Sequence, residues 1–268
     1  MLKVYFLSSE IAPFSETYSL SKFSREFSIT LNNDKDIDIR LAQPKYGYIS
    51  DRRYILREVI RLKEMEINFN NRIDYINIKS GFIPNSRVQV YFTEHSDYFS
   101  NVPELIYKSR NGRIYINNVE KYLLFSIGAL KTLEKLFWIP DVIVCNDWQI
   151  GLLPLIFNNY YKSIFKNTKI VFIGHSYNKN YICSKKNIKE LNLPINSKAK
   201  DFDILDYSIN ESNISYILDK QSGPLINRIS KDKKIKKNKY EIFEYCSSTD
   251  QEQRIDIYNK IANNLKKL

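Results

Sequence analysis

The chain begins with LKVYFLSSEIAPFSETYSL, residues 2–20 of a sequence of 268 residues. Leu2–Leu7 is a run of apolar, β-branched and aromatic residues with the length of a strand. A run without polar alternation is typical of a strand buried on both faces, as in a parallel sheet. Apolar side chains then recur at helical spacing, at Leu20, Phe23, Phe27 and Leu31. A strand, a loop and a helix in this order predict a doubly wound α/β domain, in which ligands bind at the carboxyl ends of the strands.

The loop between this strand and this helix, residues 9–20, is therefore expected to form part of the rim of a site. It contains no G-x-G-x-x-G motif, and Gly47 is the first glycine of the chain. A turn that cradles phosphate needs residues that tolerate positive φ and let the backbone approach the ligand closely. Tyr18 and Ser19 provide neither property, so on these grounds the loop is unsuited to a nucleotide.

Several blocks of the sequence resemble, in collinear order, the N-terminal catalytic domain of bacterial glycogen and plant starch synthases (glycosyltransferase family 5). The blocks are SSEIAPFSETYSLSKFSREF (8–27), QPKYG (43–47), DYF (97–99), NNVEKYLLFSIGAL (117–130), WIPDVIVCNDWQIGLLP (138–154) and VFIGHS (171–176). The D-W-x-x-G-L signature in the fifth block is specific to the family. The resemblance covers roughly residues 2 to 180. The sequence resembles still more closely the short, stand-alone single-domain forms of the family.

The resemblance implies one half of a two-Rossmann-domain glycosyltransferase. The family reaction moves glucose from ADP-glucose or UDP-glucose to a growing α-1,4-glucan in the cleft between two domains. Only about 90 residues follow residue 180, and they lack the motifs of the family's second domain. Because holding both reactants in register supplies much of the rate enhancement, we expect the chain to be inactive alone. The alternatives are a non-catalytic glucan-binding subunit and a regulatory or partner-dependent subunit completed by a second glycosyltransferase chain.

The departures from the family pattern fall mainly in the residues expected to bind the donor. Glu16 stands where the family has a lysine that contacts the donor diphosphate, and Tyr18 and Ser19 replace two glycines. A carboxylate repels a diphosphate, whereas a lysine attracts it. Asn146 and Gln149 stand where the family has histidines on either side of its Asp-Trp pair. The sequence therefore resembles the family more closely in the residues that form the scaffold than in the residues that bind the donor.

Two residues are predicted as catalytic. His175 follows the strand-like run 170–173 after Gly174, and the matching family histidine lines the sugar site. A structural histidine at a strand end is the alternative. Asp147 ends another strand and precedes a helix, so capping of that helix is favoured over contact with the substrate. The second histidine, His95, lies among polar residues and is expected at the surface.

Four further residues are predicted to bind substrate. Glu10, in the matched S-S-E block, is expected to orient the loop, and Glu16 either reaches the ligand or faces solvent. Trp148 is expected to stack on a sugar ring or to pack in the core. Tyr46 belongs to an aromatic and arginine-rich loop that suggests either a carbohydrate platform or an exposed hairpin edge.

The pattern of elements predicts one Rossmann-like, doubly wound domain with a mainly parallel sheet over residues 1–222. Strand-like runs indicate a β-rich insertion at about 54–93, with hairpins that stand beside the main sheet, and the first of these runs is Tyr54–Leu62. Ile214–Leu218 is predicted to be the last strand of the parallel sheet. A basic linker with a short extended segment is expected over 223–248.

Residues 249–268 are expected to form an amphipathic C-terminal helix that docks on this domain. An apolar stripe runs along that helix, at Ile255, Tyr258, Ala262, Leu265 and Leu268. Such a stripe must be buried, either on the chain's own domain or on a partner protein.

The net charge of +11 is concentrated in one place, because residues 228–239 hold seven basic residues and one acidic residue. Without interleaved aromatic residues or a zinc pattern, such a run indicates a solvated loop more than a nucleic-acid site. Three cysteines lack the spacing of disulfides or metal ligands, and no cofactor or metal is expected. We expect a cytoplasmic protein without a membrane partner, whose ligands are an α-glucan and a sugar nucleotide such as ADP-glucose.

Overall fold

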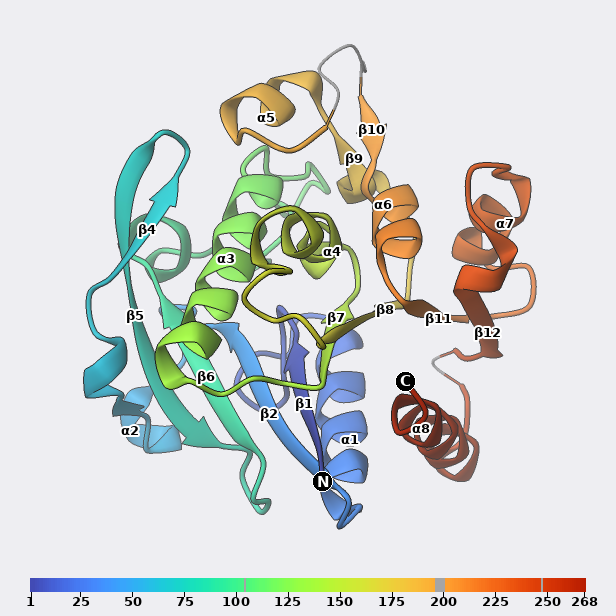
Figure 1. Ribbon diagram of the computed structural model, residues 1–268, viewed down its shortest axis with the longest axis horizontal. Helices are drawn as coiled ribbons and strands as arrows, with labels where there is room; N and C mark the ends of the chain where they lie inside the picture. Colours follow the sequence, from blue (N-terminus) through green and yellow to red (C-terminus); the bar gives the residue numbers. More distant parts are fainter. Residues whose placement is uncertain (104, 196–200, 247) are drawn as a thin grey trace.

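The computed structural model describes residues 1–103, 105–195, 201–246 and 248–268. A single large sheet runs through it in the strand order β12-β11-β8-β7-β1-β2-β6-β5-β3 (Figure 1). The strands in this order are β1 (Leu2–Leu7), β2 (Ile37–Pro44), β3 (Arg57–Glu58), β5 (Arg72–Phe82), β6 (Gln89–Glu94), β7 (Val142–Asn146), β8 (Lys169–Gly174), β11 (Ile214–Asp219) and β12 (Tyr240–Glu244), and a tenth strand, β4 (Met65–Phe69), pairs with β5 off this path. β1 pairs in parallel with both β2 and β7, so the N-terminal strand lies in the middle of the sheet, as its apolar composition predicts.

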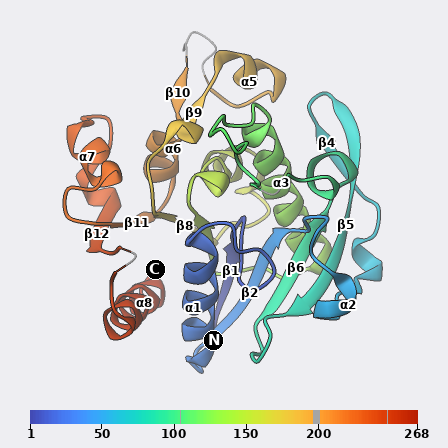
Figure 2. The same ribbon diagram turned by 180° about the vertical axis from the view of Figure 1, so that it is seen from behind.

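Helices cover both faces of the sheet, which confirms the predicted Rossmann-like α/β fold. Figures 1 and 2 show α3 and α4 over one face and α1 over the other. The helices are α1 (Leu20–Asn33), α2 (Asp51–Tyr54), α3 (Asn118–Leu136), α4 (Leu153–Ile156), α5 (Lys185–Glu190), α6 (Ile204–Glu211), α7 (Pro224–Lys231) and α8 (Gln251–Leu265). α1 buries Phe23 and Phe27 because both lie on the apolar stripe seen in the sequence. A small ribbon of β9 (Ile182–Cys183) and β10 (Phe202–Asp203) lies beside the main sheet.

The insertion differs from its predicted form in two respects. The strand predicted over Tyr54–Leu62 is wrong, because Tyr54 ends α2 and only Arg57–Glu58 pairs as a strand. β4 (Met65–Phe69) and β5 form an antiparallel hairpin, but β5 also pairs with β6. β6 in turn runs parallel to β2, so the hairpin extends the main sheet instead of standing apart from it.

The sheet also continues beyond its predicted last strand. β12 pairs in parallel with β11 over five residue pairs, from Ser215 with Tyr240 to Asp219 with Glu244. Residues 223–248, expected as a basic linker with a short extended segment, supply α7 and an edge strand of the sheet. Within α7, the guanidinium of Arg228 forms ion pairs with carboxylates of this chain, so part of the basic run is neutralised internally.

α8 packs along α1, and the two helices share polar as well as apolar contacts. The guanidinium Nε of Arg254 lies 3.0 Å from Oε2 of Glu26, and the Tyr258 hydroxyl donates to the same oxygen over 3.1 Å. The buried face of α8 differs at its ends from the predicted stripe, because Ile255 and Leu268 are exposed. The buried side chains are Ile257, Tyr258, Ile261, Ala262 and Leu265. Among the described residues, no helix combines the length and apolarity required to cross a bilayer.

Candidate functional site

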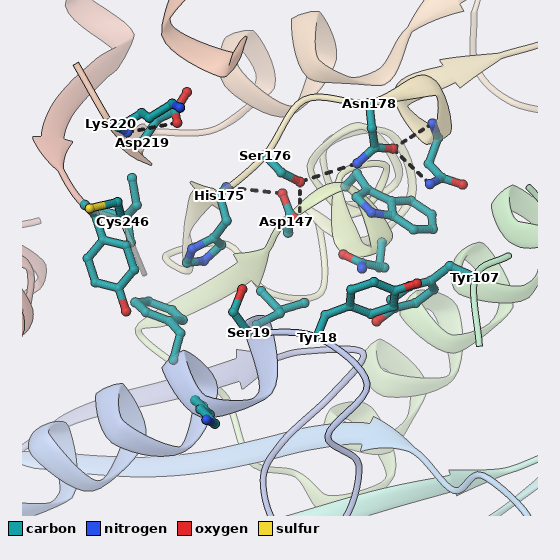
Figure 3. A pocket seen from close by; sticks show the side chains of 18 of the residues that line it. Tyr18, Ser19, Tyr107, Asp147, His175, Ser176, Asn178, Asp219, Lys220 and Cys246 are labelled. Atoms are coloured by element: carbon teal, nitrogen blue, oxygen red, sulfur yellow. Dashed lines mark hydrogen bonds between the residues drawn. The ribbon is translucent and has the colours of Figure 1, made fainter. Parts of the chain in front are cut away.

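A pocket of about 850 Å³ lies at the carboxyl ends of the parallel strands. The wall of the pocket contains residues from the ends of four of these strands. Each is either the last residue of its strand or one of the residues that follow directly. These residues are Asp147 to Gln149 after β7, His175 and Ser176 after β8, Asp219 and Lys220 at the end of β11, and Tyr245 and Cys246 after β12. The loop after β1 contributes Tyr18 and Ser19, as the order of elements in the sequence predicts. Figure 3 shows the His175 ring between Cys246 and Asp147, near the start of α1.

The imidazole of His175 makes a hydrogen bond with the buried side-chain amide of Asn146. Its Nε2 lies 2.7 Å from Oδ1 of Asn146, the last residue of β7. The ring of Phe23 meets the imidazole edge to face, with centroids 4.3 Å apart. Burial lowers the pKa of His175 to about 3, so the imidazole is neutral at physiological pH. A neutral imidazole at the pocket wall can exchange hydrogen bonds with a ligand without adding charge.

Asp147 is buried, and its backbone adopts φ of 60° and ψ of −174°. This positive φ is unusual for a residue with a side chain. Its carboxylate accepts hydrogen bonds from the backbone N–H of His175 (3.2 Å), the Tyr181 hydroxyl (2.9 Å) and the Ser176 hydroxyl (3.3 Å). The predicted helix cap is wrong, because the side chain makes no capping bond to the 3₁₀ turn Trp148–Ile150. Asp147 instead ties the end of β7 to the segment that follows β8.

Burial raises the pKa of Asp147 to about 6 from its ordinary value of 3.8, although its hydrogen bonds oppose the shift. The folded state therefore binds more protons than the unfolded state between about pH 4 and pH 6, and stability falls as the pH rises through this window. Asp147→Asn removes this titration. We expect the free energy of unfolding of the wild type, relative to that of the variant, to fall by on the order of 2 kcal/mol from pH 4 to pH 7. Urea unfolding at both pH values measures this difference, and a pH-independent difference would contradict the prediction.

Glu10 lies beneath the loop that forms the rim, and its side chain is fully buried. Oε2 accepts the backbone N–H groups of Thr17 (2.6 Å) and Tyr18 (3.3 Å), and Oε1 accepts the Tyr107 hydroxyl (2.7 Å). Burial raises the pKa of Glu10, while these hydrogen bonds oppose the rise. Glu10 thus positions the loop, as the sequence suggests, and it does so from outside the pocket wall.

Of the other predicted substrate-binding residues, Trp148 lines the pocket, whereas Glu16 and Tyr46 do not. Glu16 is exposed and Tyr46 is fully buried, and neither lies in the pocket wall. The Tyr46 hydroxyl donates to the backbone carbonyl of Ser9, so Tyr46 is a core residue and not part of a surface platform. Trp148 does reach the pocket wall, but it is buried and packs edge to face against Tyr107 and Tyr122.

Sequence reasoning missed the charge of the pocket. Five cations and three carboxylates line it, namely Lys22, Lys108, Lys179, Lys220 and Arg254 with Glu26, Asp147 and Asp219. Arg254 is paired with Glu26, whereas the four lysines have no ion pair among the described residues. These cations come from five separate segments of the chain. Only Lys22 lies in a block that resembles the family, two positions after Leu20, so only Lys22 could have been expected near the pocket from the sequence.

Two other sequence-based expectations concern metals and His95. In the described part of the chain, no three His, Cys, Asp or Glu side chains are grouped so as to hold a metal ion. His95 is buried, and the prediction that it lies at the surface is wrong. Its Nδ1 accepts the backbone N–H of Asp97 over 3.2 Å, and its Nε2 lies 3.6 Å from the Asp74 carboxylate.

The fold agrees with the comparisons with known proteins. A profile of the starch synthase catalytic domain matches residues 3–217. A glycogen synthase of Chlorobium chlorochromatii is 36% identical over 179 residues, which cover 65% of this chain and 36% of that protein. A glycogen synthase of Chlorobium limicola is 35% identical over 176 residues, with the same two coverages. The chain thus spans about a third of the length of these relatives.

A solved structure supports the assignment of the fold. The catalytic domain of starch synthase IV from Arabidopsis thaliana, bound to ADP and acarbose, superposes with a TM-score of 0.67 at 19% identity. The match covers 80% of this chain and 44% of that chain. At this identity the likeness concerns the fold, which is one half of the two-domain enzyme. With more than three quarters of its residues matched by the profile, this chain belongs to the starch synthase catalytic domain family.

Proposed function

We propose that the pocket at the carboxyl edge binds glucosyl units of an α-1,4-glucan, and that residues 1–268 bind such a ligand without efficient glucose transfer. The observation that supports this proposal best is the pocket itself, which lies at the carboxyl edge of a sheet in a member of a glucosyltransferase family. Its volume of about 850 Å³ suits a ligand of several sugar units. His175 and the hydrogen-bonded carboxylate of Asp147 would orient the sugar.

The donor is expected to bind weakly because its diphosphate meets no fixed cation in the rim loop. Glu16 occupies the position of the family lysine and points into solvent outside the pocket wall. The four lysines of the pocket wall, which have no ion pair with any residue that the structure describes, still attract an anion over a distance. They stand on separate segments, however, and flexible ammonium groups orient a phosphate less well than a fixed, hydrogen-bonded cation does. Lysines that attract the donor without orienting its diphosphate allow weak binding of the donor but not efficient transfer of its glucose.

A thermal-shift screen with maltooligosaccharides, ADP-glucose and UDP-glucose tests the binding. Since a ligand that binds only the folded state raises its stability, we expect maltooligosaccharides to raise Tm. The His175→Ala variant should lose most of that rise. His95→Ala, the same substitution outside the pocket, should keep it even if its own Tm is lower. Absence of a rise for the wild type with every sugar would overturn the proposed binding.

Turnover is measured separately, with radiolabelled ADP-glucose and glycogen. We expect no incorporation of glucose into glycogen above that of a heat-denatured control. Many turnovers per chain would contradict the second half of the proposal while leaving the first half intact.

A further inference from the structure

Residues 175–180, the wall segment, follow β8 and form one side of the pocket. The residues of this segment that line the pocket are His175, Ser176, Asn178, Lys179 and Asn180. Tyr177 stands between two of them, yet its side chain lies in a separate hollow of about 700 Å³ together with Asp203 and Arg228. Figure 3 shows Ser176 and Asn178 on the pocket side, and neighbouring side chains of an extended segment point to opposite sides. Tyr177 therefore holds the wall segment from its outer side.

The hydroxyl of Tyr177 makes two hydrogen bonds on that outer side. It donates to Oδ2 of Asp203 over 2.6 Å and accepts from Nε of Arg228 over 3.3 Å. Asp203 caps α6, because its Oδ1 accepts the backbone N–H of Leu205 over 2.9 Å, and Arg228 belongs to α7. One hydroxyl group thus ties the wall segment to two helices.

The guanidinium of Arg228 bridges three carboxylates. Oδ2 of Asp203 and Oδ1 of Asp206 each lie 2.9 Å from its Nη2, and Oδ2 of Asp232 lies 2.5 Å from its Nη1. The four side chains are at most 22% exposed, so water screens these charges only in part. Charge-assisted hydrogen bonds of this kind fix Asp203 in the orientation in which it accepts the Tyr177 hydroxyl. Tyr177, Asp203 and Arg228 together form a clamp on the outer side of the wall segment.

The clamp is connected to the inner side of the pocket through one aromatic contact. The ring of Tyr177 stacks on that of Tyr181, with centroids 5.4 Å apart and planes inclined by 25°. The Tyr181 hydroxyl donates to Oδ1 of Asp147, and the same oxygen accepts the backbone N–H of His175. A displacement of Tyr177 would therefore reach the start of the wall segment through packed and hydrogen-bonded side chains.

We propose that Tyr177 and Arg228 are positioning residues of the pocket, because their clamp fixes the wall segment in the arrangement that binds the ligand. Neither residue lines the pocket, so both act through the residues that do. The proposal deepens the proposed function and rests on it only for the choice of a sugar as ligand. When the binding-competent form of a pocket is less populated, the apparent affinity falls in proportion. A loosened clamp should therefore weaken binding without removing any contact with the ligand.

Amide hydrogen exchange tests the clamp without a ligand, in the variant Tyr177→Phe, which keeps the ring and removes the hydroxyl. The backbone N–H of His175 donates to Asp147, so its exchange reports the opening of the wall segment. If this opening breaks the clamp, loss of the hydroxyl should make the exchange roughly tenfold faster.

Tyr207→Phe is the matched control for this measurement. Tyr207 lines the same outer hollow, and its hydroxyl has no hydrogen-bond partner among the described residues. We expect the exchange of the His175 amide to stay at the wild-type rate in this variant. An unchanged rate in Tyr177→Phe, or equal rates in the two variants, would overturn the clamp.

Titration with maltotriose tests whether the clamp acts on binding. We expect Tyr177→Phe to raise Kd about threefold, and Tyr207→Phe to bind like the wild type. Arg228→Gln leaves three carboxylates without their shared cation and should raise Kd about tenfold. Arg228→Lys restores a cation that cannot bridge all three, so its Kd should lie between those of the wild type and Arg228→Gln.

These outcomes separate positioning from a merely structural role, since a fall in overall stability leaves Kd unchanged while the chain stays folded. An unchanged Kd in Tyr177→Phe would overturn the positioning role, whatever the change in its Tm. If Arg228→Gln does not fold, Tyr177→Phe and Arg228→Lys decide the question. If the wild type does not bind maltotriose at all, the proposed function fails, and the exchange of the His175 amide alone decides whether the clamp holds the wall segment.

Discussion

Glu10→Ala is expected to lower the free energy of unfolding by about 3 kcal/mol, since four donors lose a buried acceptor. These donors are the backbone N–H groups of Thr17 and Tyr18 and the hydroxyls of Tyr107 and, at 3.5 Å, Ser15. Each was desolvated on folding, and the alanine methyl group offers none of them a partner. The rim loop should become less ordered as well, because the Glu10 carboxylate accepts two of its backbone N–H groups. Urea unfolding at pH 7 measures the loss.

Glu16→Ala is the matched control, since Glu16 is a carboxylate of the same loop that is exposed. We expect its midpoint of unfolding to stay close to that of the wild type. Equal unfolding midpoints for Glu10→Ala and Glu16→Ala would show that the buried carboxylate does not stabilise the loop. A Glu10→Ala variant that is too unstable to purify would agree with the prediction in direction, and Glu10→Gln then measures a smaller step. Glutamine retains one oxygen for the backbone N–H groups, so its loss should be the lesser of the two.

Tyr258→Ala should lower the free energy of unfolding by about 4 kcal/mol, the largest effect we expect in α8. Tyr258 is fully buried, and its ring lies edge to face against Phe23 (5.5 Å) and Phe27 (5.8 Å) of α1. Its hydroxyl also donates to Glu26. Removal of the ring leaves a cavity between the two helices that the fixed backbones cannot fill. Chemical denaturation followed by far-UV circular dichroism measures the loss.

Two further variants separate packing from other causes. Tyr258→Phe removes only the hydroxyl and should cost about 1 kcal/mol. Ile255→Ala changes an exposed side chain on the same helix and should have little effect. If Tyr258→Ala were as mild as Ile255→Ala, α8 would not be part of the folded domain, and the proposed docking of the C-terminal helix would fail.

The first β-α-β unit and the family were predictable because each rests on local patterns. An apolar run gives a buried strand, a stripe with helical spacing gives α1, and the block around Asp147 carries the family signature. The rim loop was predictable for the same reason, since the order of strand and helix places it at the carboxyl edge. Edge elements were harder to predict. β12 is half exposed, so its composition does not distinguish a strand from a loop, and only its pairing with β11 identifies it.

Local order along the chain was therefore sufficient for the class of fold and for the expectation that His175 lies at the carboxyl edge of the sheet, where it lines the pocket. Long-range packing assigned the roles of the polar side chains. Asn146 meets Ser8 and Ser24 across 138 and 122 positions of the chain, and no spacing rule relates residues so far apart. The burial that makes the carboxylates of Glu10 and Asp147 structurally important has the same origin. Whether a polar group is exposed or enclosed depends on what the rest of the chain places around it, and hydrogen bonding and pKa follow from that enclosure.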